Sequence, residues 1–321
     1  MRKTGLFLAS IVLSATLWAE LPEKKGLDVI NRANAEAYIG FLASDALEGR
    51  EAGFRGGRIA GEYIVSNLKT MGIEPLFESY YQPFEAYNKE RQKKGRFQVH
   101  PDSIAKLKQG VHQKLSMNNI LGKIEGKNPN EYVIIGAHYD HLGFDPMLDG
   151  DRVYNGADDN ASGVSAVLQV AKAFLATGVQ PERTVIFAFW DGEEKGLLGS
   201  KYFVQTFSEM DKVKGYLNYD MIGRNKDESK PMHVVYFYTE AHPVFGDWLK
   251  NDIKKYGLNL TPDYRPWDKP VGGSDNASFA LLDIPVIWYH TDGHPDYHMP
   301  SDHVEKINWN KIVDITKASF L

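Results

Sequence analysis

One stretch decides the class of fold, Thr184-Val-Ile-Phe-Ala-Phe-Trp190, and it runs directly into Asp191-Gly192-Glu193-Glu194. Apolar side chains at consecutive positions place apolar groups on both faces of a strand, as in a central parallel strand that is covered by helices on each side. In open α/β sheets, ligands bind just beyond the carboxyl ends of the strands. The acidic pair lies at such an end, so we expect a functional site there.

Strand and helix patterns alternate along the rest of the chain. Residues 162–175 place Val164, Val167, Leu168 and Ala171 on one face, which indicates an amphipathic helix. Further helices are expected at 35–42, 57–71, 243–256 and 276–282, and strands at 119–124, 132–137, 184–190, 213–219, 232–238 and 285–289. This alternation predicts a three-layer α/β/α domain with a mixed, mostly parallel central sheet.

The first residues have the pattern of an export signal. Arg2 and Lys3 precede an uncharged apolar stretch from Leu6 to Leu17, and Ala19 offers a cleavage point. The stretch is too short to span a bilayer. We therefore expect a signal peptide over 1–19, one domain over 20–321, and a periplasmic or secreted protein without a stable membrane anchor.

Composition excludes several classes of chemistry. The chain has no Cys, which removes thiol catalysis, thiolate metal ligands, disulfides and lipid attachment at a cysteine. Any metal must be held by His, Asp and Glu. A formal charge of −5 and a pI near 6.1 give no reason to expect a nucleic-acid partner. We interpret the basic stretch 89–114 as a solvated face or a flexible loop.

Further metal-binding side chains follow other apolar runs. They are His138 with Asp140 nearby, Asp158 and Asp159, Asp220, and His298. Imidazole nitrogen and carboxylate oxygen both suit zinc, and mixed shells leave positions open for water. Two neighbouring metals usually share a carboxylate, so one bridging acid with one His and one acid per metal makes five ligands. A sixth, unligated acid would then serve as general base.

Two acidic residues fit the remaining roles. On a loop beyond a strand end, one of Glu193 and Glu194 can bind metal while the other faces the substrate. Asp140, two residues after His138, would accept a hydrogen bond from the free nitrogen of that imidazole and fix its tautomer.

Together these motifs resemble metallopeptidase family 28, the dizinc aminopeptidases of the aminopeptidase S/Y type in the zinc exopeptidase superfamily. The motifs are His138-Tyr-Asp140, Gly156-Ala-Asp158-Asp159-Asn-Ala-Ser-Gly163, Glu193-Glu194 followed by Gly196-Leu-Leu-Gly-Ser200, Asp220-Met-Ile-Gly223, Tyr297-His298-Met-Pro-Ser-Asp302, and, earlier, Leu42-Ala-Ser-Asp-Ala-Leu-Glu-Gly-Arg50 and Gly72-Ile-Glu-Pro75. The resemblance extends from about residue 35 onward. It implies the zinc exopeptidase (phosphorylase/hydrolase-like) fold and two Zn²⁺ per chain, with cobalt and manganese left open.

The resemblance also implies roles for single residues. The implied metal ligands are His138, Asp158 and Asp220 for one ion, and Asp158, Glu194 and His298 for the other. Asp158 would bridge, and Glu193 would be the general base. The family tends to place a cis peptide bond after the bridging Asp, here between Asp158 and Asp159. We expect Asp159 itself to be a loop or helix-capping acid.

Several side chains near these motifs have open roles. Spacing alone does not choose among His290, His294, His298 and His303, and the motif match selects His298. His141 is either a pocket wall or a surface residue. Asp302 is a candidate tether for the His298 loop, and Asp275 is interpreted as structural. Trp267, Trp288 and Tyr289 are candidate walls of a substrate pocket.

The leading functional hypothesis is an exported zinc aminopeptidase that acts on peptides with a free N-terminus. A carboxypeptidase would need a cation for the substrate's terminal carboxylate, and Arg224 or Arg265 could serve. A glutaminyl-cyclase-like enzyme would use a single zinc. A catalytically inactive binding module would have lost ligands or the base, whereas this sequence fills all six positions.

Overall fold

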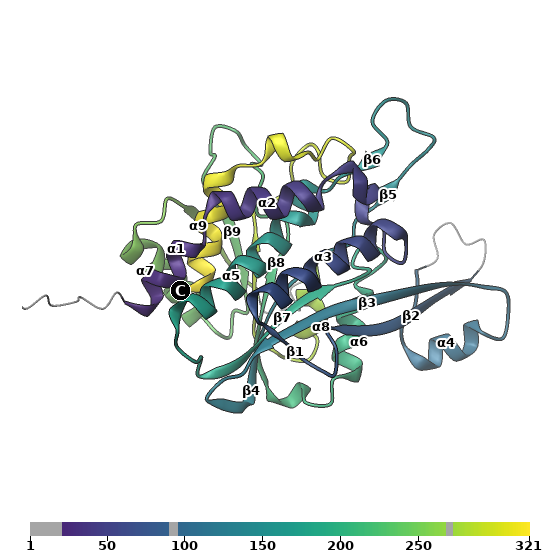
Figure 1. The fold of residues 1–321 in the computed structure, drawn as a ribbon, viewed down its shortest axis with the longest axis horizontal. Coiled ribbons are helices and arrows are strands. Elements are labelled where there is room, and N and C mark those ends of the chain that lie inside the picture. The colour runs from purple at the N-terminus through teal and green to yellow at the C-terminus, as the bar shows by residue number, and fades with distance from the viewer. Residues whose placement is uncertain (1–20, 90–95, 268–271) are drawn as a thin grey trace, which may run out of the picture.

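The computed structural model describes residues 21–89, 96–267 and 272–321 (Figure 1). The signal peptide expected over 1–19 lies outside the described residues. Within the described ranges, no helix combines the length and the apolar character needed to cross a bilayer. The basic stretch is described in part: its exposed residues include Lys106 and Lys108, at the end of a short solvent-facing helix.

The described chain folds around a nine-stranded mixed sheet with the order β1-β3-β7-β4-β8-β11-β9-β10, and β2 pairs with β3. The strands are β1 (Glu74–Pro75), β2 (Tyr81–Lys89), β3 (His112–Ile124), β4 (Asn128–His138), β7 (Arg183–Trp190), β8 (Val213–Tyr219), β9 (His233–Tyr238), β10 (Thr261–Pro266) and β11 (Val286–His290). A separate two-stranded ribbon is formed by β5 (Gly143–Phe144) and β6 (Val153–Tyr154).

The four central strands β7, β4, β8 and β11 run parallel to their neighbours in that set. β3 joins β7, and β9 joins β11, in antiparallel pairs. The mixed sheet expected from the sequence is therefore confirmed, with its parallel part at the centre.

Helices cover both faces of the sheet (Figure 1). One layer contains α1 (Pro22–Val29), α2 (Arg32–Leu42), α3 (Arg55–Met71), α5 (Gly163–Thr177), α7 (Val244–Tyr256) and α9 (Trp309–Phe320). The other contains α6 (Leu198–Thr206) and α8 (Asn276–Ala280), while α4 (Pro101–Leu107) packs near β2. The α/β/α class expected from the sequence is confirmed.

Strand β7 shows why both of its faces are apolar. Phe187 and Phe189 belong to the core on the α5 side, whereas Ile186 and Trp190 belong to the core on the α6 side. Alternate side chains of a strand point to opposite faces, so a strand between two helical layers has no polar face.

The carboxyl ends of the central strands meet at one edge. In the sheet register His138, the last residue of β4, is opposite Trp190, the last residue of β7. Gly136 of β4 is opposite Asn218 of β8. The residues that follow β7 and β8 are therefore brought beside His138, as the strand pattern predicts.

Candidate metal centre

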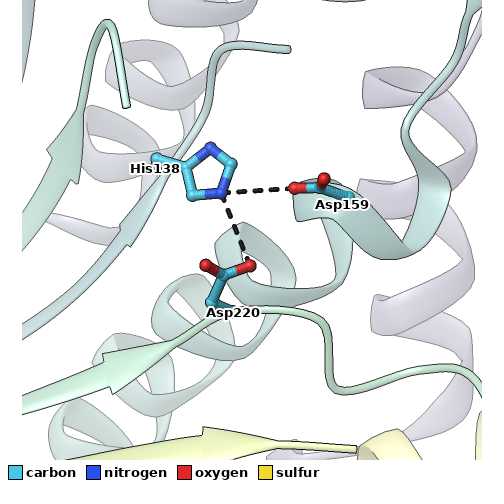
Figure 2. A group of neighbouring side chains, drawn as sticks. All are labelled: His138, Asp159 and Asp220. Atoms are coloured by element: carbon cyan, nitrogen blue, oxygen red, sulfur yellow. Dashed lines mark ion pairs between the residues drawn. The ribbon is translucent and has the colours of Figure 1, made fainter. Parts of the chain in front are cut away.

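Three side chains converge at this edge (Figure 2). Nε2 of His138 lies 3.3 Å from Oδ1 of Asp159 and 3.5 Å from Oδ1 of Asp220. All three residues are buried. One imidazole and two carboxylates that face a common point are a ligand set that suits a divalent transition metal.

A second cluster shares one member with the first. Oδ2 of Asp159 lies 3.3 Å from Nε2 of His298, and that nitrogen lies 3.2 Å from Oε2 of Glu194. Nδ1 of His141 lies 2.9 Å from Oε1 of Glu194. Asp159 therefore directs one carboxylate oxygen to each cluster, which is the arrangement of a carboxylate shared by two metals.

This geometry corrects the assignment of the shared acid. Asp158, expected to bridge, points away from both clusters: its Oδ1 accepts a hydrogen bond from the Gly223 N–H at 2.6 Å, and its Oδ2 lies 3.3 Å from Nε2 of His294. Asp159, expected to be a loop or capping acid, occupies the shared position. Adjacent side chains outside a helix point in different directions, so only one of the two acids can face the clusters.

The backbone around Asp159 is held on several sides. Asp302 Oδ2 accepts hydrogen bonds from the N–H groups of both Asp158 and Asp159, each at 3.0 Å. Asp302 was expected to tether the His298 loop, and its carboxylate binds the turn that contains Asp158 and Asp159. Asp159 has non-helical φ and ψ of −105° and 93°. The cis peptide bond lies between Asp159 and Asn160, one residue later than the sequence suggested.

Asp140 supports the site differently from the expectation. Its carboxylate accepts hydrogen bonds from the backbone N–H of Glu193 at 3.0 Å and of Glu194 at 3.3 Å. The free Nδ1 of His138 is bound by the Asp140 backbone carbonyl at 3.2 Å, and the carboxylate is 3.7 Å away. Asp140 therefore orients the two glutamates through its side chain and the imidazole through its main chain.

The charges of the site stabilise one another. Burial opposes the charged form of His298, but Asp159 and Glu194 outweigh it and raise the pKa of His298 to about 10. Burial likewise opposes the carboxylate of Asp159, and His141, His138 and His298 hold its pKa well below the usual range. The acids and imidazoles therefore balance one another's charge, and a metal bound here would replace the imidazole protons.

Glu193 has a different environment from Glu194. Burial, assisted by Asp275, Asp220 and Glu194, raises the pKa of Glu193 well above that of an ordinary glutamate. The pKa of Glu194 is lowered, because His141 and His298 outweigh both burial and the charge of Asp159. A raised pKa suits a group that takes up and releases a proton, and a lowered one suits a metal ligand.

A cavity of about 250 Å³ opens onto the first cluster. It is lined by His138, Asp159, Glu193, Asp220, Met221, Gly273, Trp288, His290, Gly293, Tyr297 and His298. Trp288 is a wall residue, as expected. Tyr289 is buried in the core on the α5 side, and Trp267 packs beside Phe237, so these two are absent from the described lining.

Two other histidines of the tail have partners outside the two clusters of ligand atoms. Nδ1 of His290 contacts the Asp220 carbonyl oxygen at 2.6 Å, and His303 Nε2 lies 2.9 Å from Asp151. His141 is fully buried beside Glu194, which excludes the surface alternative. The sequence did contain a signal that His141 lies at the site: it comes three residues after His138, beyond the end of the same strand.

The two arginines considered for a carboxypeptidase do not appear in the described cavity lining. Arg224 is buried, with Nη2 2.7 Å from Asp296 Oδ2. Arg265 makes two contacts of 3.1 Å with Asp292. Both guanidinium groups already have carboxylate partners.

Residues 119–320 match the pattern of Peptidase family M28. The chain belongs to this family. It is 34% identical over 170 residues to leupeptin-inactivating enzyme 1 of Streptomyces exfoliatus, covering 52% of this chain and 34% of that protein. It is 38% identical over 115 residues to an aminopeptidase of Pseudomonas aeruginosa, covering 35% of this chain and 19% of that protein. The aligned part thus spans about a third or less of these relatives.

Solved structures with low identity share the M28 chain's fold. BSAP, a zinc aminopeptidase from Bacillus subtilis, aligns with a TM-score of 0.69 and 17% identity over 90% of this chain and 94% of that one. The glutaminyl cyclase of Porphyromonas gingivalis aligns with a TM-score of 0.63 and 16% identity over 91% of this chain and 97% of that one. The zinc exopeptidase fold expected from the sequence is confirmed.

Proposed function

We propose that this M28 protein is an exported aminopeptidase that binds two zinc ions and removes N-terminal residues from peptides. The observation that carries the proposal is the placement of Asp159, which directs one oxygen toward His138 and the other toward His298. In this assignment one ion is held by His138, Asp159 and Asp220, and the other by Asp159, Glu194 and His298.

When bound, the two ions would supply Lewis acidity toward a carbonyl group and lower the pKa of a bound water. Glu193 lines the cavity next to these ligands. Its carboxylate is the base that takes a proton from the attacking water and passes it to the nitrogen of the leaving amine. The raised pKa of Glu193 favours holding that proton between the two transfers.

The charge distribution favours a free amine over a free carboxylate in the substrate. The described lining of the cavity includes the acids Asp159, Glu193 and Asp220. Arg224 and Arg265 are paired elsewhere with Asp296 and Asp292. Among the described residues that line the cavity there is no Arg or Lys to pair with a substrate's terminal carboxylate, which favours an aminopeptidase over a carboxypeptidase.

A glutaminyl-cyclase-like reaction is the second candidate, supported by the likeness to the Porphyromonas gingivalis enzyme. A single-zinc enzyme of this kind needs one complete ligand set. Here Asp159 has a His and an acid on each side. Metal content near one ion per chain, together with cyclisation of an N-terminal glutamine, would favour this candidate.

Export is proposed from the sequence of residues 1–19. Expression of the full chain in a bacterial host, followed by N-terminal sequencing of the periplasmic fraction, tests it. A mature N-terminus close to residue 20 supports export, and full-length protein retained in the cytoplasm contradicts it.

The activity is tested with one peptide in free and N-acetylated forms, digested with and without a chelator and followed by mass spectrometry. Stepwise loss of N-terminal residues from the free form alone, abolished by the chelator, is the expected result. Metal-loaded Glu193→Gln protein is the matched control for contaminating peptidases. Trimming of the acetylated peptide from its C-terminus would instead indicate a carboxypeptidase.

A further inference from the structure

A single arginine ties together the backbone segments that present the metal-binding side chains. Arg50 ends the 3₁₀ segment Asp45–Arg50, and its side chain is buried, with 1% of the residue exposed. The guanidinium donates to five backbone carbonyl oxygens: Nε to Tyr139 at 3.0 Å, Nη1 to Leu42 at 2.6 Å and Asn155 at 2.5 Å, and Nη2 to Gly156 at 2.9 Å and Asp159 at 3.4 Å.

The Leu42 carbonyl ends α2, and the other four belong to the two parts of the chain that present the metal-binding side chains. Tyr139 lies between His138 and Asp140, at the end of β4. Gly156 and Asp159 belong to the turn that presents the shared carboxylate. Arg50 therefore fixes the distance between the end of β4 and the Asp159 turn. The carboxylate of Asp302 holds the same turn by accepting a hydrogen bond from the Asp159 N–H.

The turn itself, together with the guanidinium, leaves no room for a side chain at Gly156. A Cβ there would lie 2.0 Å from the Asp159 carbonyl oxygen and 2.8 Å from Nη2 of Arg50. The φ of Gly156 is +57°, a conformation that glycine adopts without strain. The turn and the arginine fit each other closely.

The backbone of Arg50 is anchored to the same region. Its carbonyl oxygen accepts a hydrogen bond from the N–H of His141 at 3.1 Å, and Glu51 next to it pairs with Lys195, which follows the two glutamates. The five donors of an arginine lie in one rigid plane. A lysine offers three donors from one point, so it cannot bind carbonyls on both sides of the turn.

We propose that Arg50 is a positioning residue of the metal centre, holding the His138 and Asp159 backbones at the separation that lets Asp159 serve both clusters. This inference rests on the proposed function, because it concerns the same two-metal site. The role is geometric: a positive charge beside the ligands by itself weakens the attraction of a cation, so the contribution of Arg50 comes from its five hydrogen bonds.

The test compares Arg50→Lys and Arg50→Ala with the wild type, using Co²⁺ as the probe metal. We expect Co²⁺ affinity to fall about 10–100-fold, as when other groups that orient metal ligands are lost. The visible absorption spectrum of bound Co²⁺ should change, and kcat at saturating metal should fall more than KM rises. Added guanidinium ion should partly restore the Co²⁺ spectrum of Arg50→Ala.

Two control variants separate positioning from general stability. Arg58 is exposed and donates to one carbonyl, that of Gly53, so Arg58→Lys should leave every measurement unchanged. Leu47, buried in the same 3₁₀ segment, contributes to the core. Leu47→Ala should lower Tm while keeping the Co²⁺ spectrum of the wild type.

The outcomes discriminate between the claims. Arg50→Lys with wild-type Co²⁺ affinity, spectrum and kcat overturns the positioning role, even if its Tm is lowered. If Arg50→Ala does not fold, the lysine variant decides the question alone. A wild-type protein that binds no Co²⁺ overturns the proposed two-metal site and this inference together, whereas unaltered variants of an active wild type overturn this inference only.

Discussion

Replacing either Asp158 or Asp159 by asparagine, in two separate variants, gives the sharpest test of the site geometry. Asp159→Asn removes the negative charge whose two oxygens lie 3.3 Å from His138 and 3.3 Å from His298. Asp158→Asn alters a side chain that contacts Gly223 and His294 instead. The two variants have the same chemistry at neighbouring positions, so each is the control for the other.

The expected magnitudes follow from what each carboxylate touches. Without Asp159, each cluster keeps two of three proposed protein ligands, and each ion loses a charged oxygen. Loss of a group that only orients a ligand weakens metal binding about 10–100-fold, so we expect at least about 100-fold at both positions, or about 2.7 kcal/mol each. Asp158→Asn keeps an acceptor for Gly223 but loses its charge beside His294, so we expect about 1.5–3 kcal/mol of lost stability with metal binding retained.

The assay measures zinc per chain after dialysis against a weak chelator, together with thermal unfolding of the metal-loaded and chelated forms. Asp159→Asn should lose bound zinc and the stabilisation that zinc provides. Asp158→Asn should retain the wild-type zinc content at a lower Tm. The opposite pattern, with zinc lost from Asp158→Asn and kept by Asp159→Asn, would refute the assignment of Asp159 as the shared ligand.

Three further substitutions test other parts of the site. Glu193→Gln should keep its metal content while turnover falls about 10²–10⁴-fold, because the base is lost; a metal-loaded variant with near-normal turnover would remove Glu193 from that role. Asp140→Asn should lower metal affinity about 10–100-fold, since its carboxylate holds the N–H groups of Glu193 and Glu194; competition titration with a chromogenic chelator measures this, and unchanged affinity contradicts it. Asp296 has a lowered pKa, because Lys306, Ser301 and Arg224 outweigh its burial. The stability it contributes is therefore present above the unfolded-state pKa of about 3.9 and is lost as the pH falls below it. Asp296→Asn should cost about 1.5–3 kcal/mol at pH 7, and its difference from wild type in urea unfolding should shrink below about pH 4; a difference independent of pH would contradict the pairing.

The central strand β7 could be predicted because it has no polar face. Phe187 and Trp190 face different helical layers, so this strand has to lie in the middle of the sheet, where both of its faces are covered. The edge strands were missed for a physical reason. β2 contains Pro83, and β10 contains Pro262 and Pro266. Proline lacks an N–H for the ladder, so such segments resemble loops unless an edge position is known.

The residues at strand ends could be predicted from their type, but their exact partners could not. Asp158 and Asp159 are chemically identical. The backbone turn that directs the Asp159 carboxylate toward the two clusters is held by Asp302 and Arg50, which are distant in the sequence. Asp140 was placed near His138 correctly, yet its carboxylate binds backbone N–H groups 53 and 54 residues away. Such contacts depend on sheet order and not on local spacing.

The two halves of the centre differ in how firmly the backbone carries them. His138 is at the end of a strand with a hydrogen-bonded neighbour on each side, and its side chain is 1% exposed. His298 comes from a loop, with φ of +56° and a side chain that is 37% exposed. On the proposed assignment, the ion at His298 should exchange with the surroundings faster than the ion at His138. If the protein is exported as proposed, its activity would then depend on the free zinc concentration outside the cytoplasm, because the ion at His298 would be lost and regained while the ion at His138 stayed bound.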